Sequence, residues 1–202
     1  MTWSIKSIPL LVERVCAEEK GATLMEFGIV SVVFITMLLG MMDIGQMAYT
    51  QAVLNGAAQS VSREVALENG DPDLSDAELT KLVRRVAPGA TITPERKSYF
   101  DFDDIERAEQ FNDADGDGFC NNDENFVDEN GNGQWDEDVG VKGNGGANDV
   151  VVYTVTASYE PLFKIPFYDN ASAKRELSAT FVKKNQPFSA QNALGSTVGV
   201  CS

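Results

Sequence analysis

The sequence predicts an α+β fold, in which a long N-terminal helix, transmembrane in its first part, precedes a small antiparallel-sheet domain with a loop-rich insertion. Three observations lead to this prediction. Residues 24 to 42 form an apolar run with a single charge. Residues 43 to 68 continue that run at helical spacing without a proline. Segments rich in β-branched and aromatic residues follow, separated by stretches rich in Gly, Asn and Asp.

The composition excludes several classes of function. The chain has 202 residues and a net charge of −15, with 31 acidic against 16 basic side chains and no histidine. A phosphate backbone attracts Lys and Arg, so we expect no nucleic-acid partner. Without histidine the usual general base and the Ser-His and Cys-His pairs are absent, and we expect no enzyme. An enzyme built on clustered carboxylates such as Asp101, Asp103 and Asp104 is the remaining alternative.

The apolar run predicts one membrane span. Its 19 residues would extend about 28 Å as a helix, close to the roughly 30 Å hydrocarbon core of a bilayer. Lys6, Arg14 and Lys20 precede the run, and the next basic residue is Arg63. The positive-inside rule therefore places the N-terminus in the cytoplasm and the chain from Ala48 onward outside. A secretory signal peptide is the competing interpretation, but the segment before the span is long and mixed in charge for one.

An acidic residue at the start of the span indicates processing. Glu26 lies five residues after Gly21, and a carboxylate in a bilayer costs roughly 2 to 3 kcal/mol at the centre and less near the interface. We expect cleavage between Gly21 and Ala22, which would leave Glu26 as the fifth residue of the mature chain, followed by Phe27. The alternative is a glutamate that merely reaches the interface.

These residues carry a resemblance to a known family. The stretch from Lys20 to Phe27 resembles the class III prepilin-peptidase site of type IV-like pilins. The segment from Gly21 to Glu68, with its Met42-Asp43-Ile44-Gly45-Gln46 stretch, is similar to TadE-like pseudopilins of the tight-adherence (Flp, type IVc) pilus. The closing segment from Glu176 to Phe188 is also similar to that family, although Gln46 and Gln186 stand where it commonly has Arg and Glu.

The resemblance implies a function and a set of partners. It implies cleavage by a prepilin peptidase, residence in the inner (cytoplasmic) membrane, and work with other pilins or pseudopilins in building an adhesive pilus. It also implies the pilin plan, an N-terminal helix laid on a small antiparallel sheet. In that setting the Glu26 carboxylate positions the leader in the peptidase, or pairs with the free amine of Ala22 on an adjacent subunit.

The outer domain has its own local signals. A capping box at Ser75-Asp76-Ala77-Glu78 predicts a helix from Asp76 to Val86. Residues 162 to 168 form a hydrophobic hairpin or loop placed near the membrane or a partner. The predicted strands are Thr91 to Thr93, Lys97 to Phe102, Asp149 to Tyr159 and Glu176 to Val182.

Two loops between these strands predict calcium binding. The first has acids at positions 1, 3 and 5, a Gly at position 6, a backbone carbonyl at 7 and a Glu at 12, as an EF-hand loop does. These residues are Asp113, Asp115, Asp117, Gly118, the Phe119 carbonyl and Glu124. Ca²⁺ prefers six to eight oxygen ligands, so this loop is a candidate Ca²⁺ site.

The second loop follows at once and is less regular. Its ligand candidates are Asp128, Asn130, Asn132 and Gln134, with Asp136 or Asp138 closing the shell because position 12 is Val139. Calcium in both loops would hold the segment rigid. The alternative is a solvated acidic linker, since Gly, Asn and Asp also favour disorder.

The sequence does not decide whether two of its three cysteines form a disulfide. Cys16 precedes the span, whereas Cys120 and Cys201 follow it. In an oxidising compartment Cys120 and Cys201 form a disulfide, and otherwise they are two unrelated thiols.

The sequence thus divides into a cytoplasmic leader (1–21), a transmembrane and extended helix (22–68) and an extracytoplasmic α+β domain (69–202) that contains the calcium loops (113–139). The main hypothesis is a processed pseudopilin whose outer domain is stabilised by calcium. The alternative is a membrane-anchored calcium-dependent adhesin or sensor that does not enter a pilus.

Overall fold

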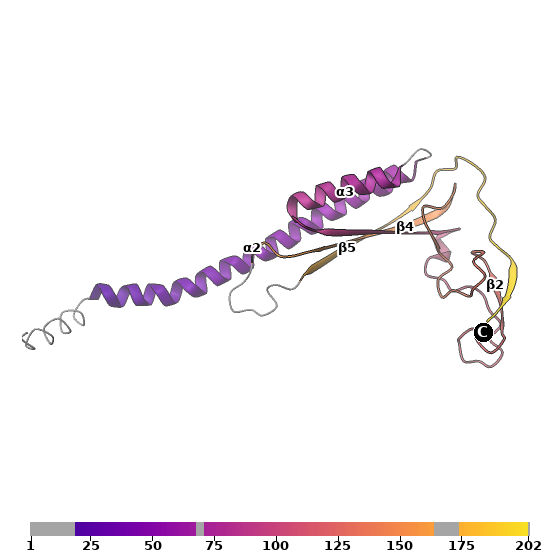
Figure 1. The fold of residues 1–202 in the computed structure, drawn as a ribbon, viewed down its shortest axis with the longest axis horizontal. Helices are drawn as coiled ribbons and strands as arrows, with labels where there is room; N and C mark the ends of the chain where they lie inside the picture. Colours follow the sequence, from indigo (N-terminus) through magenta and orange to yellow (C-terminus); the bar gives the residue numbers. More distant parts are fainter. Residues whose placement is uncertain (1–18, 68–70, 164–173, 202) are drawn as a thin grey trace, which may run out of the picture. The chain divides into compact units, whose positions relative to one another are not determined.

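The computed structural model describes residues 19–67, 71–163 and 174–201, which fall into two compact units. The first unit comprises Met1–Gln46 and Pro161–Ala173, and the second comprises Met47–Glu160 and Lys174–Ser202. Helix α2 (Glu19–Val65) contributes to both (Figure 1). Part of the predicted hydrophobic hairpin, residues 164 to 168, lies outside the described residues, as do leader residues 1 to 18.

In the first unit, helix α2 is long and apolar enough to cross a membrane, with an 18-residue window of mean hydropathy 2.2. Its large apolar side chains are exposed, among them Phe27 and Phe34. Ser31 and Thr36 donate their hydroxyls to the Gly28 and Val32 carbonyls one turn back. In the apolar interior of a membrane, a polar side chain needs a hydrogen-bond partner within the protein, and these bonds provide one. The predicted continuous helix is confirmed, and it ends at Val65.

The second unit contains a four-stranded antiparallel sheet in the order β3-β1-β4-β5. Helix α3 and the second half of α2 lie on one face of it (Figure 1). The strands are β1 (Thr91–Tyr99), β3 (Val141–Lys142), β4 (Val150–Tyr159) and β5 (Arg175–Lys184), and α3 spans Pro72–Val86. The core between the layers contains Leu54, Ala58, Val61, Leu79, Val83, Tyr153, Val155 and Ala157.

Helix α3 begins four residues earlier than its sequence predicts, at Pro72 rather than Asp76. Asp71 is the N-cap, and its carboxylate accepts the N–H groups of Asp73 (3.0 Å) and Leu74 (3.2 Å). Proline at the first helical position loses no bond, because that N–H has no partner inside a helix. The Asp71-Pro72 pair therefore starts the helix, and Ser75, the predicted cap, lies buried within it.

Strand β1 is one continuous strand where the sequence predicts two. Pro94 interrupts the pattern of polar and apolar residues, but it stays in register opposite Val155 of β4. Strand β3 pairs with β1 only at Lys97 and Ser98. Pro94 therefore lies where the other side of β1 has no neighbouring strand, and there a missing N–H costs no ladder bond.

One polar network fastens helix α3 to the sheet. Asp76 of α3 accepts two bonds from the Arg96 guanidinium of β1 (2.8 and 2.5 Å) and one from the Tyr153 hydroxyl of β4 (2.9 Å). The guanidinium carbon also lies 4.5 Å from the centroid of the Tyr153 ring. Burial raises the pKa of the Tyr153 hydroxyl above its usual range, and Asp76 raises it further.

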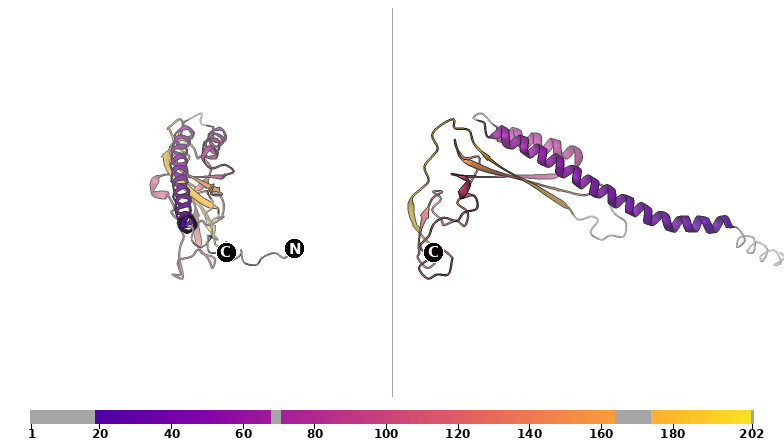
Figure 2. Two further views of the ribbon diagram at one scale, coloured as in Figure 1. Left: turned by 90° about the vertical axis from the view of Figure 1, so that its left-hand side faces the viewer. Right: turned by 180° about the vertical axis from the view of Figure 1, so that it is seen from behind.

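A second, two-stranded sheet pairs β2 (Asn125–Asp128) with β6 (Thr197–Val200). Figure 2 shows the yellow C-terminal strand returning alongside β2. Gly199 lies against the Phe126 ring, and a Cβ at this position would come within 2.3 Å of it. Next to this sheet a disulfide joins Cys120 to Cys201, so the two cysteines left open by the sequence are paired. We call residues 109–139 together with β6 the loop module.

Candidate functional site

The candidate processing site lies at the start of α2. The bond between Gly21 and Ala22 belongs to the first turns of the helix, which begins at Glu19. Gly21, Glu26 and Phe27 are exposed, and the Phe27 side chain is 73% accessible. The predicted recognition residues are thus exposed on the apolar helix.

The first calcium loop folds its carboxylates inward. Oxygens of Asp113, Asp115 and Asp117 all lie within 4.8 Å of one another. Asp113 accepts the N–H groups of Gly116 (2.7 Å) and Gly118 (3.1 Å), which wraps the backbone around its side chain. Gly116 and Gly118 have φ of +77° and +82°, a conformation that glycine adopts without steric cost. Three hard anionic oxygens held this close together fit a divalent cation.

Glu124 closes the first loop from the far end. Its side chain is buried, and its two carboxylate oxygens accept the N–H groups of Ala114 (2.5 Å) and Asn121 (3.3 Å). These are positions 2 and 9 of the loop. The Asn121 amide donates to Asp117, whose pKa is lowered mainly by this bond, and the Asn121 Oδ1 atom is buried without a hydrogen-bond partner. A buried acceptor without a donor is a group that a cation would satisfy.

The second loop has the same backbone wrapping. Asp128 accepts the N–H groups of Gly131 (2.7 Å) and Gly133 (2.9 Å), as Asp113 does in the first loop. The side-chain oxygens of Asn130 and Asn132 accept the N–H groups of Asn132 and Gln134. The side-chain amides of Asn130 and Asn132 both donate to Asp136. The structure therefore brings Asp128, Asn130, Asn132, the Gln134 backbone and Asp136 together.

Asp138, the other candidate for closing the second loop, lies elsewhere. Its carboxylate accepts from the Lys97 ammonium (2.6 Å) and the Tyr99 hydroxyl (3.1 Å) of β1. Burial raises the pKa of Asp138, but its bonds to Lys97, the Gly140 N–H and Tyr99 outweigh burial and hold this pKa below its usual range. Burial and the neighbouring carboxylate raise the pKa of Tyr99 to about 12. Asp138 thus binds the loop module to the sheet rather than facing the loop.

Glu109 belongs to the second loop although it precedes both loops in sequence. It is 1% exposed, and its carboxylate accepts the N–H groups of Glu129 (2.8 Å), Asn130 (3.2 Å) and Asp136 (3.3 Å). Reading each loop as a block of twelve residues misses Glu109. Comparing the sequences that precede the two loops finds it, because Glu109 and Glu124 both lie four residues before the first Asp of a loop.

An ion pair connects the start of the second loop with the segment that precedes the loop module. The Arg107 guanidinium contacts Glu129 (2.5 Å) and Asp104 (2.9 Å). The bond from Arg107 lowers the pKa of Glu129 below its usual range, and the two carboxylates raise the pKa of Arg107.

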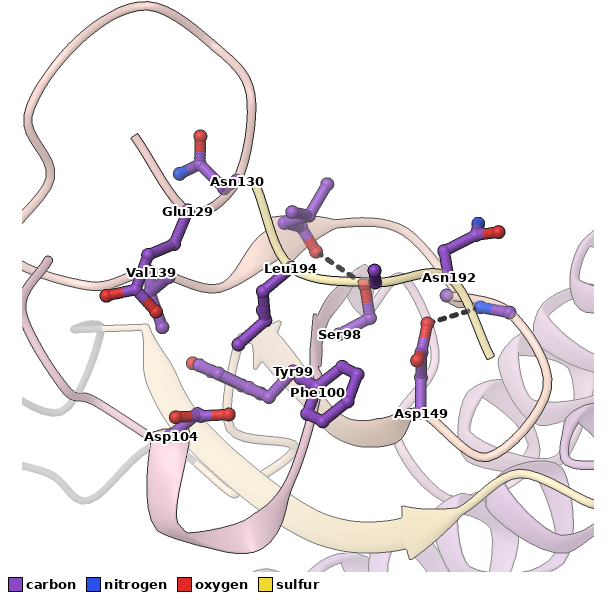
Figure 3. Close-up of a pocket in the computed structure, with 14 residues that line it drawn as sticks. Ser98, Tyr99, Phe100, Asp104, Glu129, Asn130, Val139, Asp149, Asn192 and Leu194 are labelled. Atoms are coloured by element: carbon purple, nitrogen blue, oxygen red, sulfur yellow. Dashed lines mark hydrogen bonds between the residues drawn. The ribbon is translucent and has the colours of Figure 1, made fainter. Parts of the chain in front are cut away.

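A pocket of about 400 Å³ lies between the loop module and the sheet (Figure 3). Leu194 extends toward Tyr99 and Phe100 there. The carboxylates that line it already have partners: Asp104 and Glu129 contact Arg107, and Asp149 accepts from Gln191 and the Gly146 N–H. The loops, with their convergent oxygens, are therefore the better candidate for a ligand site in the described residues.

Comparison with known families agrees with the N-terminal features. Residues 21–63 match the family model described as TadE-like protein. No curated protein and no solved structure matches the chain. The matched segment contains the whole apolar run, Gly21, Glu26 and Phe27, and it extends into the part of α2 that packs on the sheet. At residues 21–63 the chain is therefore similar to proteins described as TadE-like.

Proposed function

We propose that this protein is a minor pilin or pseudopilin that a prepilin peptidase processes and that takes part in assembling a tight-adherence pilus. The observation that carries the proposal is the TadE-like match at residues 21–63, and it is supported by the exposure of Gly21 and Glu26 near the start of an apolar helix. The partners are the peptidase, the inner membrane and other pilins of the same pilus.

Glu26 has a physical role after cleavage. Removal of residues 1 to 21 creates a free amine at Ala22, four residues before Glu26, and four residues of helix span about 6 Å. An amine and a carboxylate offset along neighbouring parallel helices pair when one subunit is displaced along the other by that distance. The pair neutralises two charges that an apolar environment disfavours.

The disulfide supports an outer location for the second unit. Disulfides persist in oxidising compartments such as the periplasm and are rare in the cytosol. The Cys120–Cys201 disulfide therefore agrees with the charge pattern, in which basic residues precede the span and the domain after it lies outside.

The intact mass of the protein from membranes of cells that have their own prepilin peptidase tests the processing. We expect a mature chain beginning at Ala22. If Glu26 positions the leader in the peptidase, we expect Glu26→Ala to remain full-length. If Glu26 pairs with the Ala22 amine of a neighbouring subunit, we expect a cleaved chain that fails to enter pili. Glu64→Ala removes an exposed glutamate farther along the same helix and serves as the control, with normal cleavage and assembly. A wild-type chain that keeps residues 1 to 21 would contradict the proposal and leave a membrane-anchored adhesin or sensor.

We also propose that Ca²⁺ stabilises the loop module. In the first loop Asp113, Asp115, Asp117, the Phe119 carbonyl and Glu124 would hold it, and in the second loop Asp128, Asn130, Asn132, the Gln134 carbonyl and Asp136 would. The ion supplies positive charge to crowded carboxylates that otherwise repel one another. Extracellular calcium is millimolar, so a site with a Kd of about 10⁻⁴ M stays filled.

Thermal unfolding of the full chain in detergent, with calcium or with EDTA, tests this proposal. Calcium at 100 times its Kd adds about 2.7 kcal/mol to the free energy of unfolding, so we expect the melting temperature of the loop module to rise by several degrees. Asp113→Asn with Asp115→Asn removes most of the gain. As a control, Asp101→Asn with Asp103→Asn removes the same charge at exposed positions outside the loops. This variant should keep the calcium-dependent rise in melting temperature. Equal unfolding curves in calcium and EDTA would contradict the proposal.

A further inference from the structure

The loop module contains two copies of a 15-residue repeat, residues 109–123 and 124–138. Glu109 and Glu124, Phe111 and Phe126, and Asp113 and Asp128 are each 15 positions apart. Four further positions agree in type: Asp115 with Asn130, Gly116 with Gly131, Asp117 with Asn132, and Gly118 with Gly133. Each repeat therefore begins with a glutamate, passes through a phenylalanine and ends in a wrapped loop.

The two repeats face each other across a local twofold axis. Phe111 and Phe126 form an antiparallel bridge. Beside it, the Asn112 N–H donates to the Asn125 carbonyl and the Val127 N–H donates to the Gln110 carbonyl, both at 2.8 Å. The donors Asn112 and Val127 are 15 positions apart, and so are the acceptors Gln110 and Asn125. The two hydrogen bonds are therefore equivalent under exchange of the two repeats.

The same symmetry relates the two buried glutamates. Glu124, at the start of the second repeat, accepts the position 2 and position 9 N–H groups of the first loop, Ala114 and Asn121. Glu109, at the start of the first repeat, accepts the position 2 and position 9 N–H groups of the second loop, Glu129 and Asp136. Glu109 is 1% exposed and Glu124 is 5% exposed, so both glutamates are buried where they close the loops.

Val139 shows why the second loop needs a glutamate from elsewhere. It occupies position 12, where the first loop has Glu124, and it is 5% exposed in a cluster with Tyr99 and Val150. Its N–H donates to the Arg107 carbonyl. Position 12 is thus used for the packing of the loop module on the sheet, and the closing carboxylate comes from Glu109.

From this symmetry we infer that the two loops are a reciprocal pair, in which each repeat supplies the carboxylate that closes the other repeat's loop, and that they therefore bind cations as one coupled unit. Glu109 is the positioning residue of the second loop. The cation part of this inference rests on the proposed calcium function, whereas the closure is a property of the protein alone.

Coupling follows from the covalent connection between the closing groups and the loops. Glu124 lies four residues before Asp128, and Asp128 provides the first ligand of the second loop. A cation that orders the first loop also orders Glu124 and hence the start of the second loop. The second cation then binds to a loop that is already partly ordered, which gives positive cooperativity.

Two matched variants of the full chain test the inference, Glu109→Gln and Glu124→Gln, with Glu137→Gln, at an exposed position within the second loop, as the control. The first readout is amide hydrogen exchange without any cation. Glu109→Gln should speed exchange at Glu129, Asn130 and Asp136 more than at Ala114 and Asn121, and Glu124→Gln should do the reverse. Slow exchange in β4 in every variant reports that the sheet is folded. Equal loop exchange in the variants and the control would overturn the reciprocal closure.

The second readout is Tb³⁺ luminescence sensitised by Trp135, which lies in the second loop. Glu109→Gln should weaken the Tb³⁺ affinity reported there by roughly 10- to 100-fold, as loss of an outer hydrogen-bonding partner does at metal sites. Glu124→Gln should also weaken it, though less, because the loops are coupled. An unchanged signal in Glu124→Gln would overturn the coupling. Absence of Tb³⁺ and Ca²⁺ binding in the wild type would overturn the calcium proposal instead, and exchange would still decide the closure.

Discussion

Replacing Cys120 and Cys201 together by serine is expected to lower the free energy of unfolding of the loop module by about 4 kcal/mol. The two cysteines are 81 positions apart, and the chain-entropy model assigns a cross-link over a loop of that length roughly this value. The bond also holds β6 against β2, and β2 carries Asp128 of the second loop at its end. Urea unfolding followed by Trp135 fluorescence measures the effect.

Both experiments use the uncleaved full chain, in which Cys16→Ser is the control, because it removes the third cysteine of the sequence and leaves the Cys120–Cys201 disulfide intact. We expect unfolding curves equal to those of the wild type. The double serine variant avoids leaving either Cys120 or Cys201 as a lone thiol that would pair with another chain. If it unfolds at the same urea concentration as the wild type, the loops and the β2–β6 pairing hold the module together without the cross-link.

Asp76→Asn is expected to cost the sheet domain roughly 3 kcal/mol, because removing one partner of a buried ion pair leaves the other charge uncompensated. The side chains of Arg96 and Asp76 are only 12% and 18% exposed, and an asparagine keeps only one of the two acceptor oxygens that Arg96 and Tyr153 share. Because Asp76 belongs to α3 while its partners belong to β1 and β4, we expect α3 to separate from the sheet early in unfolding.

Urea unfolding followed by far-UV circular dichroism of the full chain in detergent measures this loss. Glu78→Gln removes a charge from the exposed face of the same helix, and it should change stability by less than about 0.5 kcal/mol. Equal stability of Asp76→Asn and Glu78→Gln would show that the network contributes no net stability.

The regular elements of this fold are largely predictable from the sequence. The long helix follows from a run of apolar and small residues without proline, and β4 and β5 follow from their β-branched residues. The start of α3 is not predicted correctly, because Ser75 and Glu78 imitate a capping box while Asp71-Pro72 is the stronger signal. The sequence alone does not show which of these two start signals, Ser75 with Glu78 or Asp71 with Pro72, the folded protein uses.

The loops were predictable in part. The spacing of Asp113, Asp115 and Asp117 predicts their inward-facing carboxylates. The role of Glu109 does not follow from loop spacing, because antiparallel pairing at Phe111 and Phe126 brings it to the second loop. Asp138 was a reasonable candidate by number alone, but its partners Lys97 and Tyr99 are about forty residues away in sequence and meet it only in the folded sheet.

The two edges of the four-stranded sheet have a consequence for copies crowded in a membrane. An open edge is a template on which another chain adds a strand. Along β1, Pro94 provides no N–H and β3 covers Lys97 and Ser98, so a foreign strand finds an interrupted row of donors. Along β5, charged residues stand at both ends of the strand, from Arg175 to Lys184. Neighbouring copies are thus discouraged from joining edge to edge, and their contacts are left to side chains on the helices, the loops and the faces of the sheet.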